Sequence, residues 1–292
     1  MHPPALPASK QVTMFEQLHP RIAAAILELC AVPEPDVGAC TAMLRTEAGE
    51  PVRSALAALE ARWGSFPAEG LRMLPGVDSR AWIEALLRFA PVAAARLEGM
   101  RIPAAVIEAT LADIGAQLHW HRRTHGGFGL DTAWWTTLHL SGSLYRLGRL
   151  QFHLHRDTES GPWTVGLHIP EDGALDAGSV DASLRLAATF LAEHFPAHRI
   201  DHAYCDSWLL DPHLADALPN SNMAAFSARF TNVELRDEPG DALYFTFRVP
   251  ADAEISTLPR DSSLQRVVLE RIENGGSWRV GKGLAPWPMP VG

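Results

Sequence analysis

The sequence predicts an α+β protein of two domains, an all-helical N-terminal domain followed by a domain with a mixed β-sheet. Before residue 134 the apolar residues recur at three- and four-residue spacing, which is typical of amphipathic helices. After residue 134 short apolar or alternating stretches are separated by Gly, Ser and Pro, which is typical of strands and turns. A chain of 292 residues is long enough for two domains. We expect the helical domain over residues 1–125, a linker over 126–132 and the sheet domain over 133–292.

In the N-terminal domain the apolar stripes predict five helices. The longest stripe belongs to the last of them and consists of Val106, Ile107, Leu111, Ile114 and Leu118. A proline opens this helix in the first turn, where its missing N–H group costs no hydrogen bond. The expected helices cover residues 21–32, 35–44, 51–63, a segment that begins at 79, and 103–118.

In the C-terminal domain we expect the order β-β-β-α-β-α-β-β-α-β. The first three strands are predicted over residues 134–140, 143–156 and 163–170. They are followed by a helix over 179–195, a strand over 202–210 and a short helix over 212–219. A hairpin over 224–235 and 242–249, a helix over 262–274 and a strand over 278–280 complete the domain.

The second of these strands alternates between apolar residues and a polar row. The polar row consists of Arg149, Gln151, His153 and His155. Alternation with a period of two residues is typical of a strand that is covered on one side. We therefore expect the polar row to face solvent or a covering helix.

Composition and charge exclude several classes of protein. The formal net charge is −9 and no run of Lys or Arg occurs, so a nucleic-acid partner is not expected. No apolar stretch approaches the roughly 18–20 residues that span a membrane, and the first residues do not resemble a signal peptide. Three cysteines cannot all pair with one another, which favours a reducing compartment. We expect a cytoplasmic protein with no membrane partner.

Five short motifs, in this order along the chain, resemble those of a known family. They are LGRLQF at 147–152, LHIP at 167–170, CDSWLL at 205–210, NSNMAAF at 220–226 and SSLQR at 262–266. They are similar to a bacterial acyltransferase-like family, whose members join a helical N-acyltransferase domain to a C-terminal GNAT-like (N-acetyltransferase-type) domain. The resemblance implies a mixed, mostly antiparallel sheet. It also implies an enzyme that moves an acyl group from a thioester to a small amine, with no tightly bound cofactor. The donor would be acyl-CoA or an acyl carrier protein.

In a GNAT-like fold the pantetheine arm of the donor lies along a central strand, here residues 163–169. The pyrophosphate then meets the loop before the next helix, here residues 171–178. This loop carries two glycines and the carboxylates Glu171, Asp172 and Asp176, and it departs from the R/Q-x-x-G-x-G/A pattern. Three carboxylates repel a pyrophosphate, so the alternative is a non-catalytic binding or regulatory protein that keeps the fold without a working donor site.

Three residues are candidates for the chemistry. His168 ends the third strand and is the first candidate for the base that deprotonates the amine, although a strand-end histidine also serves as a buried structural residue. Cys205 and Ser207 share one face of the next strand and could reach His168 if the two strands are neighbours. A Cys–His pair would make a Cys205-dependent enzyme the further alternative. Otherwise Cys205 is a small buried apolar residue.

Four residues are candidates for binding substrate. Ser221 and Asn222 could line the mouth of a pocket, or they could form a turn. Trp208 belongs to a pocket wall or to the core, and Arg266 could contact an anion. Gln265 is instead expected to close a capping box with the serine three residues before it.

His121 and His125 lie four residues apart near the end of the last predicted helix of the first domain. This spacing is also seen in metal-binding helices. No acidic or other third ligand follows at matching spacing, so we expect a solvated helix end and no metal.

Overall fold

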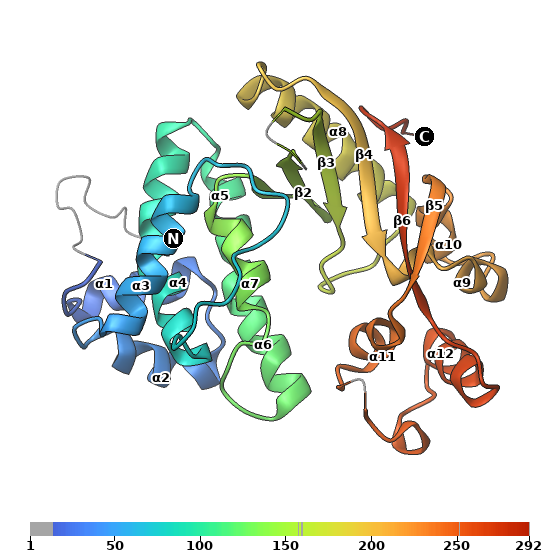
Figure 1. The fold of residues 1–292 in the computed structure, drawn as a ribbon, viewed down its shortest axis with the longest axis horizontal. Coiled ribbons are helices and arrows are strands. Elements are labelled where there is room, and N and C mark those ends of the chain that lie inside the picture. The colour runs from blue at the N-terminus through green and yellow to red at the C-terminus, as the bar shows by residue number, and fades with distance from the viewer. Residues whose placement is uncertain (1–13, 157, 159, 251, 292) are drawn as a thin grey trace. The chain divides into compact units, whose positions relative to one another are not determined.

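The computed structural model describes residues 14–156, 158, 160–250 and 252–291. The chain forms two compact units, the first ending at Tyr145 and the second beginning at Arg146 (Figure 1). This division lies further along the chain than the linker expected over 126–132. The N-terminal residues 1–13, on which the expectation about a signal peptide rests, lie outside the described residues. Within the described part, no helix is both long and apolar enough to cross a bilayer.

The first unit is helical, as predicted. Its helices are α1 (Pro20–Leu29), α2 (Glu34–Leu44), α3 (Glu50–Arg62), α4 (Ser79–Gly99), α5 (Ala104–Leu111), α6 (Asp113–His125), α7 (Ala133–Thr136) and the 3-10 turn η1 (Thr137–Leu140). The predicted helix over 103–118 is in fact two helices, which meet at Ala112. Its apolar stripe is still largely buried, because both helices direct it to the same core.

The strand predicted over 134–140 is wrong, because this segment forms α7 and η1. Residues 136–140 are all buried, so packing from every side outweighs the strand preference of Trp and Thr. The hydroxyls of Thr136 and Thr137 donate to main-chain carbonyls four and three residues earlier, at 2.9 and 2.7 Å. These bonds keep the threonines compatible with a helix.

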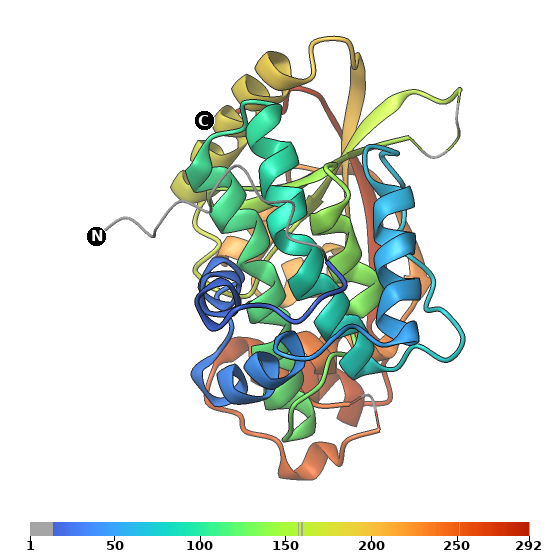
Figure 2. The same cartoon turned by 90° about the vertical axis from the view of Figure 1, so that its left-hand side faces the viewer.

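Helix α4 is the centre of the first unit. Residues 81–90 are buried without a break, and α1, α2, α3 and α5 all pack against this helix (Figure 2). A helix that is covered on all sides belongs to the core of its domain. The two charged residues inside this buried run, Glu84 and Arg88, therefore need partners within the protein.

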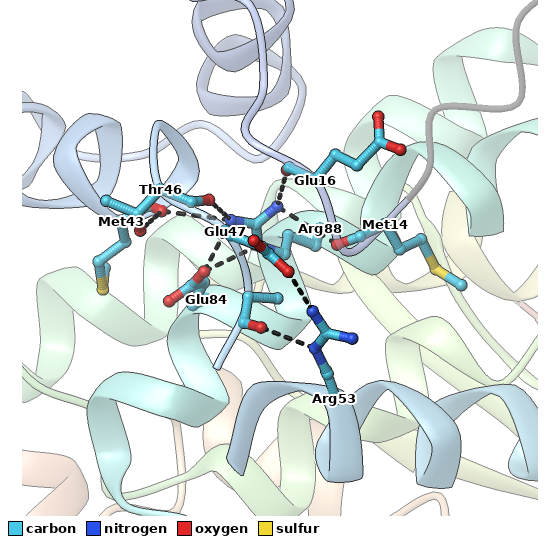
Figure 3. A network of polar contacts seen from close by, with 9 residues as sticks. Met14, Glu16, Met43, Thr46, Glu47, Arg53, Glu84 and Arg88 are labelled. Atoms are coloured by element: carbon cyan, nitrogen blue, oxygen red, sulfur yellow. Dashed lines mark hydrogen bonds and ion pairs between the residues drawn. The ribbon is translucent and has the colours of Figure 1, made fainter. Parts of the chain in front are cut away.

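Arg88 finds these partners in three separate segments of the first unit (Figure 3). Its side chain is fully buried, and its Nε donates to Glu84 Oε1 over 2.8 Å. The guanidinium also donates to the main-chain carbonyl oxygens of Met14 (3.2 Å), Glu16 (2.9 Å), Met43 (3.3 Å) and Thr46 (2.6 Å). Arg88 thus joins the N-terminal segment and the end of α2 to α4.

The second unit contains a mixed sheet that is mostly antiparallel, as the family resemblance implied. Its strands are β1 (Leu144–Leu147), β2 (Leu150–His155), β3 (Trp163–His168), β4 (Ile200–Ser207), β5 (Thr231–Asp237) and β6 (Arg279–Pro286). They lie in the order β1-β2-β3-β4-β6-β5. Strands β3 and β4 are parallel, whereas β2–β3, β4–β6 and β5–β6 are antiparallel.

The strand predicted over 143–156 is interrupted at Gly148 and forms β1 and β2. Gly148 adopts a positive φ of 69°, which an L side chain rarely tolerates, and the chain turns at Gly148 and Arg149. A Cβ at this position would also lie 2.8 Å from the Ser183 hydroxyl. The glycine therefore allows both the turn and the close approach of helix α8.

The remaining elements of the second unit connect and cover the sheet. They are α8 (Ala177–His194), η2 (Trp208–Leu210), α9 (Pro212–Ala217), α10 (Asn222–Ser227), α11 (Pro239–Phe247), η3 (Ile255–Thr257) and α12 (Ser263–Glu273). Helix α8 connects the parallel strands β3 and β4 and lies behind them in Figure 1. The hairpin predicted over 224–249 is wrong. Pro239 stands in the first turn of α11 rather than in a hairpin turn, and β5 pairs with β6.

Candidate active site

Polar side chains of three neighbouring strands meet on one face of the sheet in the second unit. The register pairs His153 of β2 with Gly166 of β3, and Gly166 with Tyr204 of β4. Two pairs further along, His155 lies opposite Thr164. Because side chains alternate between the faces of a sheet, residues of these pairs share a face. The polar row of β2 therefore continues across the sheet, and His153 and His155 are buried rather than solvated.

Three histidines and a tyrosine on this face form what we call the histidine cluster: His153, His155, His168 and Tyr204. His155 Nε2 lies 2.8 Å from the Tyr204 hydroxyl, which is hydrogen-bond distance. The His153 ring centroid lies 4.6 Å from that of His155 and 5.9 Å from that of His168. The cluster thus places imidazole nitrogens and a phenol, the usual groups of acid–base chemistry, within one connected set.

Gly166 makes room for this cluster. A Cβ at this position would lie 3.0 Å from the Tyr204 hydroxyl oxygen and 3.3 Å from His168 Nε2. Both distances are shorter than ordinary van der Waals contact. A side chain at position 166 would therefore crowd both the Tyr204 hydroxyl and the His168 ring, which would have to shift.

Within the cluster, His168 lies where β3 and β4 stop pairing. The described register of this parallel pair ends at Leu167 and Cys205, one residue before His168 ends β3. Strand β4 continues its pairing with β6 through Asp206 and Ser207. The side of β4 that faces β3 therefore extends beyond the last pair, next to His168. In an open sheet, the carboxyl ends of parallel strands are the common place for a ligand.

The structure contradicts the predicted pairing of His168 with Cys205 or Ser207. Cys205 pairs with Leu167, the neighbour of His168 in β3, so its side chain lies on the opposite face of the sheet. Ser207 has the same parity as Cys205, and its hydroxyl accepts a hydrogen bond from Leu209 N at 3.2 Å. Burial, followed by the charge of Asp206, raises the pKa of the Cys205 thiol. A neutral, buried thiol makes a poor nucleophile, which argues against a Cys205-dependent enzyme.

Three of the four predicted substrate-binding residues have local partners in the structure, and the fourth begins a helix. Trp208 is 4% exposed and packs edge-on against Trp278 in the core of the second unit. Ser221 caps α10 by accepting from Ala224 N at 3.1 Å, and Asn222 is the first residue of that helix. The Arg266 guanidinium donates to the carbonyl oxygens of residues 260 and 261. These contacts account for Trp208, Ser221 and Arg266 without a ligand.

The carboxylates of the loop after β3 are each engaged by a partner. Glu171 pairs with the guanidinium of Arg248. Asp172 lies 3.0 Å from Arg146 and 3.8 Å from Arg149. Asp176 caps α8 by accepting from Ser179 N at 2.9 Å, and its hydrogen bonds from Ser179 lower its pKa. A paired carboxylate repels an anion less than a bare one does, so the charge objection to a phosphate nearby becomes weaker.

Sequence analysis missed Tyr204 as a chemical candidate and placed His153 and His155 on a solvated or helix-covered face. The available signal was the alternation itself. Polar residues at every second position of β2, β3 and β4 lie on one face only if the three strands are neighbours, and the strand order was unknown.

A surface hollow of about 510 Å³ also occurs in the second unit. It is lined by residues of α9 and α12, including His213 and Glu270, and lies apart from the cluster.

Comparisons with known proteins fit this architecture. Residues 22–142 match the N-acyltransferase N-terminal domain, and residues 144–285 match the GNAT-like C-terminal domain. The boundary between the two matches falls next to the division between the two compact units. Among curated proteins, no relative matches the chain.

Solved structures of acyltransferases are similar over nearly the whole chain. A mutant acyltransferase in complex with octanoyl-CoA is 29% identical, with a TM-score of 0.83, and the match covers 97% of this chain and 91% of that one. An acyltransferase in complex with decanoyl-CoA is also 29% identical, with a TM-score of 0.82 and coverage of 94% and 89%. An acyltransferase in complex with CoA and 10C-teicoplanin is 29% identical, with a TM-score of 0.81, and the match covers 97% of this chain and 91% of that one. The chain therefore belongs to the family of N-acyltransferase-type enzymes that join an N-acyltransferase N-terminal domain to a GNAT-like C-terminal domain.

Proposed function

We propose that the protein transfers a medium-chain acyl group from CoA to an amine of a small molecule. The observation that supports the donor best is the similarity, over 97% of this chain, to an acyltransferase that binds octanoyl-CoA. Another solved acyltransferase structure, also 29% identical to this chain, contains decanoyl-CoA. The nature of the acyl acceptor is a separate part of the proposal. It is supported by the similar acyltransferase in complex with CoA and 10C-teicoplanin, a small molecule rather than a protein.

The end of the β3–β4 pairing suits the pantetheine arm of this donor. The arm carries two amides, which pair with exposed main-chain groups as another strand would. Such groups are expected on β4 at Asp206 and Ser207, beyond the last pair with β3. The engaged carboxylates of the loop after β3 are compatible with a phosphate group nearby, because Glu171 and Asp172 are balanced by arginines.

In the proposed reaction the histidine cluster handles the protons. The amine nitrogen attacks the thioester carbonyl, the C–N bond forms and the C–S bond breaks. His168 takes the proton that the attacking nitrogen loses. The leaving thiolate gains a proton, for which the Tyr204 hydroxyl is the candidate donor. His155 holds that hydroxyl at 2.8 Å and is a positioning residue. General acid–base steps of this kind contribute about 10²- to 10⁴-fold to a rate.

The test is release of free thiol from octanoyl-CoA in the presence of amine acceptors, including teicoplanin-type glycopeptides. We expect acceptor-dependent release by the wild-type protein. His168→Gln should lower kcat by about 10²-fold or more, because the base is lost while the strand is kept. Tyr204→Phe should lower kcat by a smaller factor than His168→Gln does. His194→Gln, near the end of α8 and outside the cluster, is the matched control and should leave the rate unchanged.

One result would overturn the proposed activity, and another would overturn the role of His168. Absence of thiol release across acyl chains and acceptors would exclude the activity, and saturable CoA binding without turnover would favour a non-catalytic binding protein. Thiol release that survives His168→Gln unchanged would keep the activity but remove His168 as the base. If no thiol is released, a calorimetric titration with octanoyl-CoA shows whether the protein still binds the donor.

A further inference from the structure

A cluster of two histidines and one aspartate lies at the end of α6 in the first unit, remote in sequence from the proposed reaction. Helix α6 ends at Gly126, which has a left-handed φ of 75° and reverses the chain. The following loop returns along the helix, since Thr132 Oγ1 donates to Gln117 Oε1 over 2.7 Å. Leu130 N donates to Ser79 Oγ at the start of α4 and fixes the loop from its other side. The path of the loop brings Asp131 back beside the last turns of α6.

Asp131 meets both histidines of the i, i+4 pair on this helix. His121 Nδ1 lies 2.9 Å from Asp131 Oδ1, and His125 Nε2 lies 3.5 Å from Asp131 Oδ2. One potential ligand atom from each of the three residues lies within 4.8 Å of the other two. The sequence argument against a metal here was the lack of a third, acidic ligand. The fold supplies that ligand six residues after His125.

We propose that His121, His125 and Asp131 bind one zinc ion. Zn–N and Zn–O bonds of about 2.0–2.1 Å at a tetrahedral ion separate the ligand atoms by about 3.3 Å. His121 Nδ1 lies 2.9 Å from Oδ1 and His125 Nε2 lies 3.5 Å from Oδ2, so each histidine approaches a different oxygen of the one carboxylate at close to this separation. Two imidazoles and a carboxylate are a common zinc set of three protein ligands, with water in the fourth position. The side chains are 17%, 40% and 33% exposed, so water has access.

The surroundings of His121 select the nitrogen that faces the ion. A Cβ on Gly129 would lie 2.3 Å from His121 Nε2, so this nitrogen is packed against the main chain of the loop. Nδ1 is left to face Asp131 and the ion. Glycine at position 129 thus permits the ring orientation that the site needs. Zinc would join the loop to α6 by three ligand bonds and would stabilise this corner of the first unit.

The test uses the full-length protein after removal of any affinity tag and of bound metal. A calorimetric titration with ZnCl₂ should give one ion per chain. His125→Ala and Asp131→Asn each remove one ligand and should weaken binding at least about tenfold, as changes around metal sites do. His119→Ala is the matched control, because His119 is exposed on the same helix and lies outside the cluster. It should leave the affinity unchanged.

Cobalt gives a second readout that requires no variant. Co²⁺ bound at a site of nearly tetrahedral geometry should show intense visible absorption bands in the wild-type protein, and ZnCl₂ should abolish them by displacement. Two results would overturn the proposal: no zinc binding by the wild type, or equal affinity in the wild type and in folded Asp131→Asn. The second result would mean that the ion binds elsewhere.

Discussion

Replacement of Arg88 by methionine should strongly destabilise the first unit. The arginine side chain is fully buried and the Glu84 side chain is 11% exposed, so solvent cannot replace the lost partner. Methionine would leave the Glu84 carboxylate buried without its ion pair. It would also leave the main-chain carbonyls of Met14, Glu16, Met43 and Thr46 without this donor. Removal of one partner of a buried pair costs about 3–5 kcal/mol, and we expect a loss in this range.

The assay is urea denaturation followed by far-ultraviolet circular dichroism, because the first unit is helical. The matched control is the double variant Glu84→Leu/Arg88→Met, which removes both charges and should be less destabilised than Arg88→Met alone. A loss below about 1 kcal/mol for Arg88→Met would refute the argument, since that is the size expected for an exposed ion pair. Equal losses in the single and double variants would show that the carbonyl contacts, and not the ion pair, dominate.

Three further predictions concern packing, reactivity and pH. Gly115→Ala should lower the free energy of unfolding by about 3 kcal/mol in a thermal or urea melt, because the added Cβ would lie 2.1 Å from a main-chain oxygen. Gly38→Ala is the control, and it should be neutral or slightly stabilising because the space around Gly38 is open. Cys205 should resist iodoacetamide in the native protein and react in urea, as mass spectrometry would show; rapid native labelling would contradict its burial. Burial, and then the charge of Arg156, lower the pKa of His198 in the folded protein. As the pH falls below about 6.5, His198 is therefore protonated in the unfolded chain before it is protonated in the folded one. The stability that depends on His198 is therefore complete above that pH and declines below it, and His198→Gln should show a smaller decline in urea midpoint between pH 7 and 5.

Local signals in the sequence predicted many of the helix boundaries. Ser262 and Gln265 form the expected capping box at the start of α12, and the short helix expected from residue 212 begins there, with Asp211 as its cap. These interactions involve residues two or three positions apart, so the sequence contains all the information that they need.

Predictions that depended on distant partners failed. Residues 134–140 have the composition of a strand but are helical, and residues 136–140 are buried within the first unit. Pro239-Gly240 resembles a hairpin turn, yet it opens a helix, because β5 pairs with β6 from the end of the chain. Strand pairing over more than forty residues leaves no local pattern.

In the candidate site, too, alternation within one strand can be predicted from the sequence, whereas the pairing between strands cannot. His168, Gly166 and Thr164 lie on one face of β3, as every second residue of a strand does. Whether Cys205 or Tyr204 shares that face depends on the register between β3 and β4, which only the fold determines. The zinc proposal depends in a similar way on Gly126, because the reversed loop brings Asp131 to the histidines.

The most direct test of the proposed function is mass spectrometry of an amine acceptor incubated with the protein and isotope-labelled octanoyl-CoA. The account predicts that the label appears on the acceptor through an amide bond, in amounts equal to the free CoA released, and that His168→Gln nearly abolishes both products. Label that stays on CoA with every amine and acyl chain tested, while the folded protein still binds octanoyl-CoA, would contradict the account.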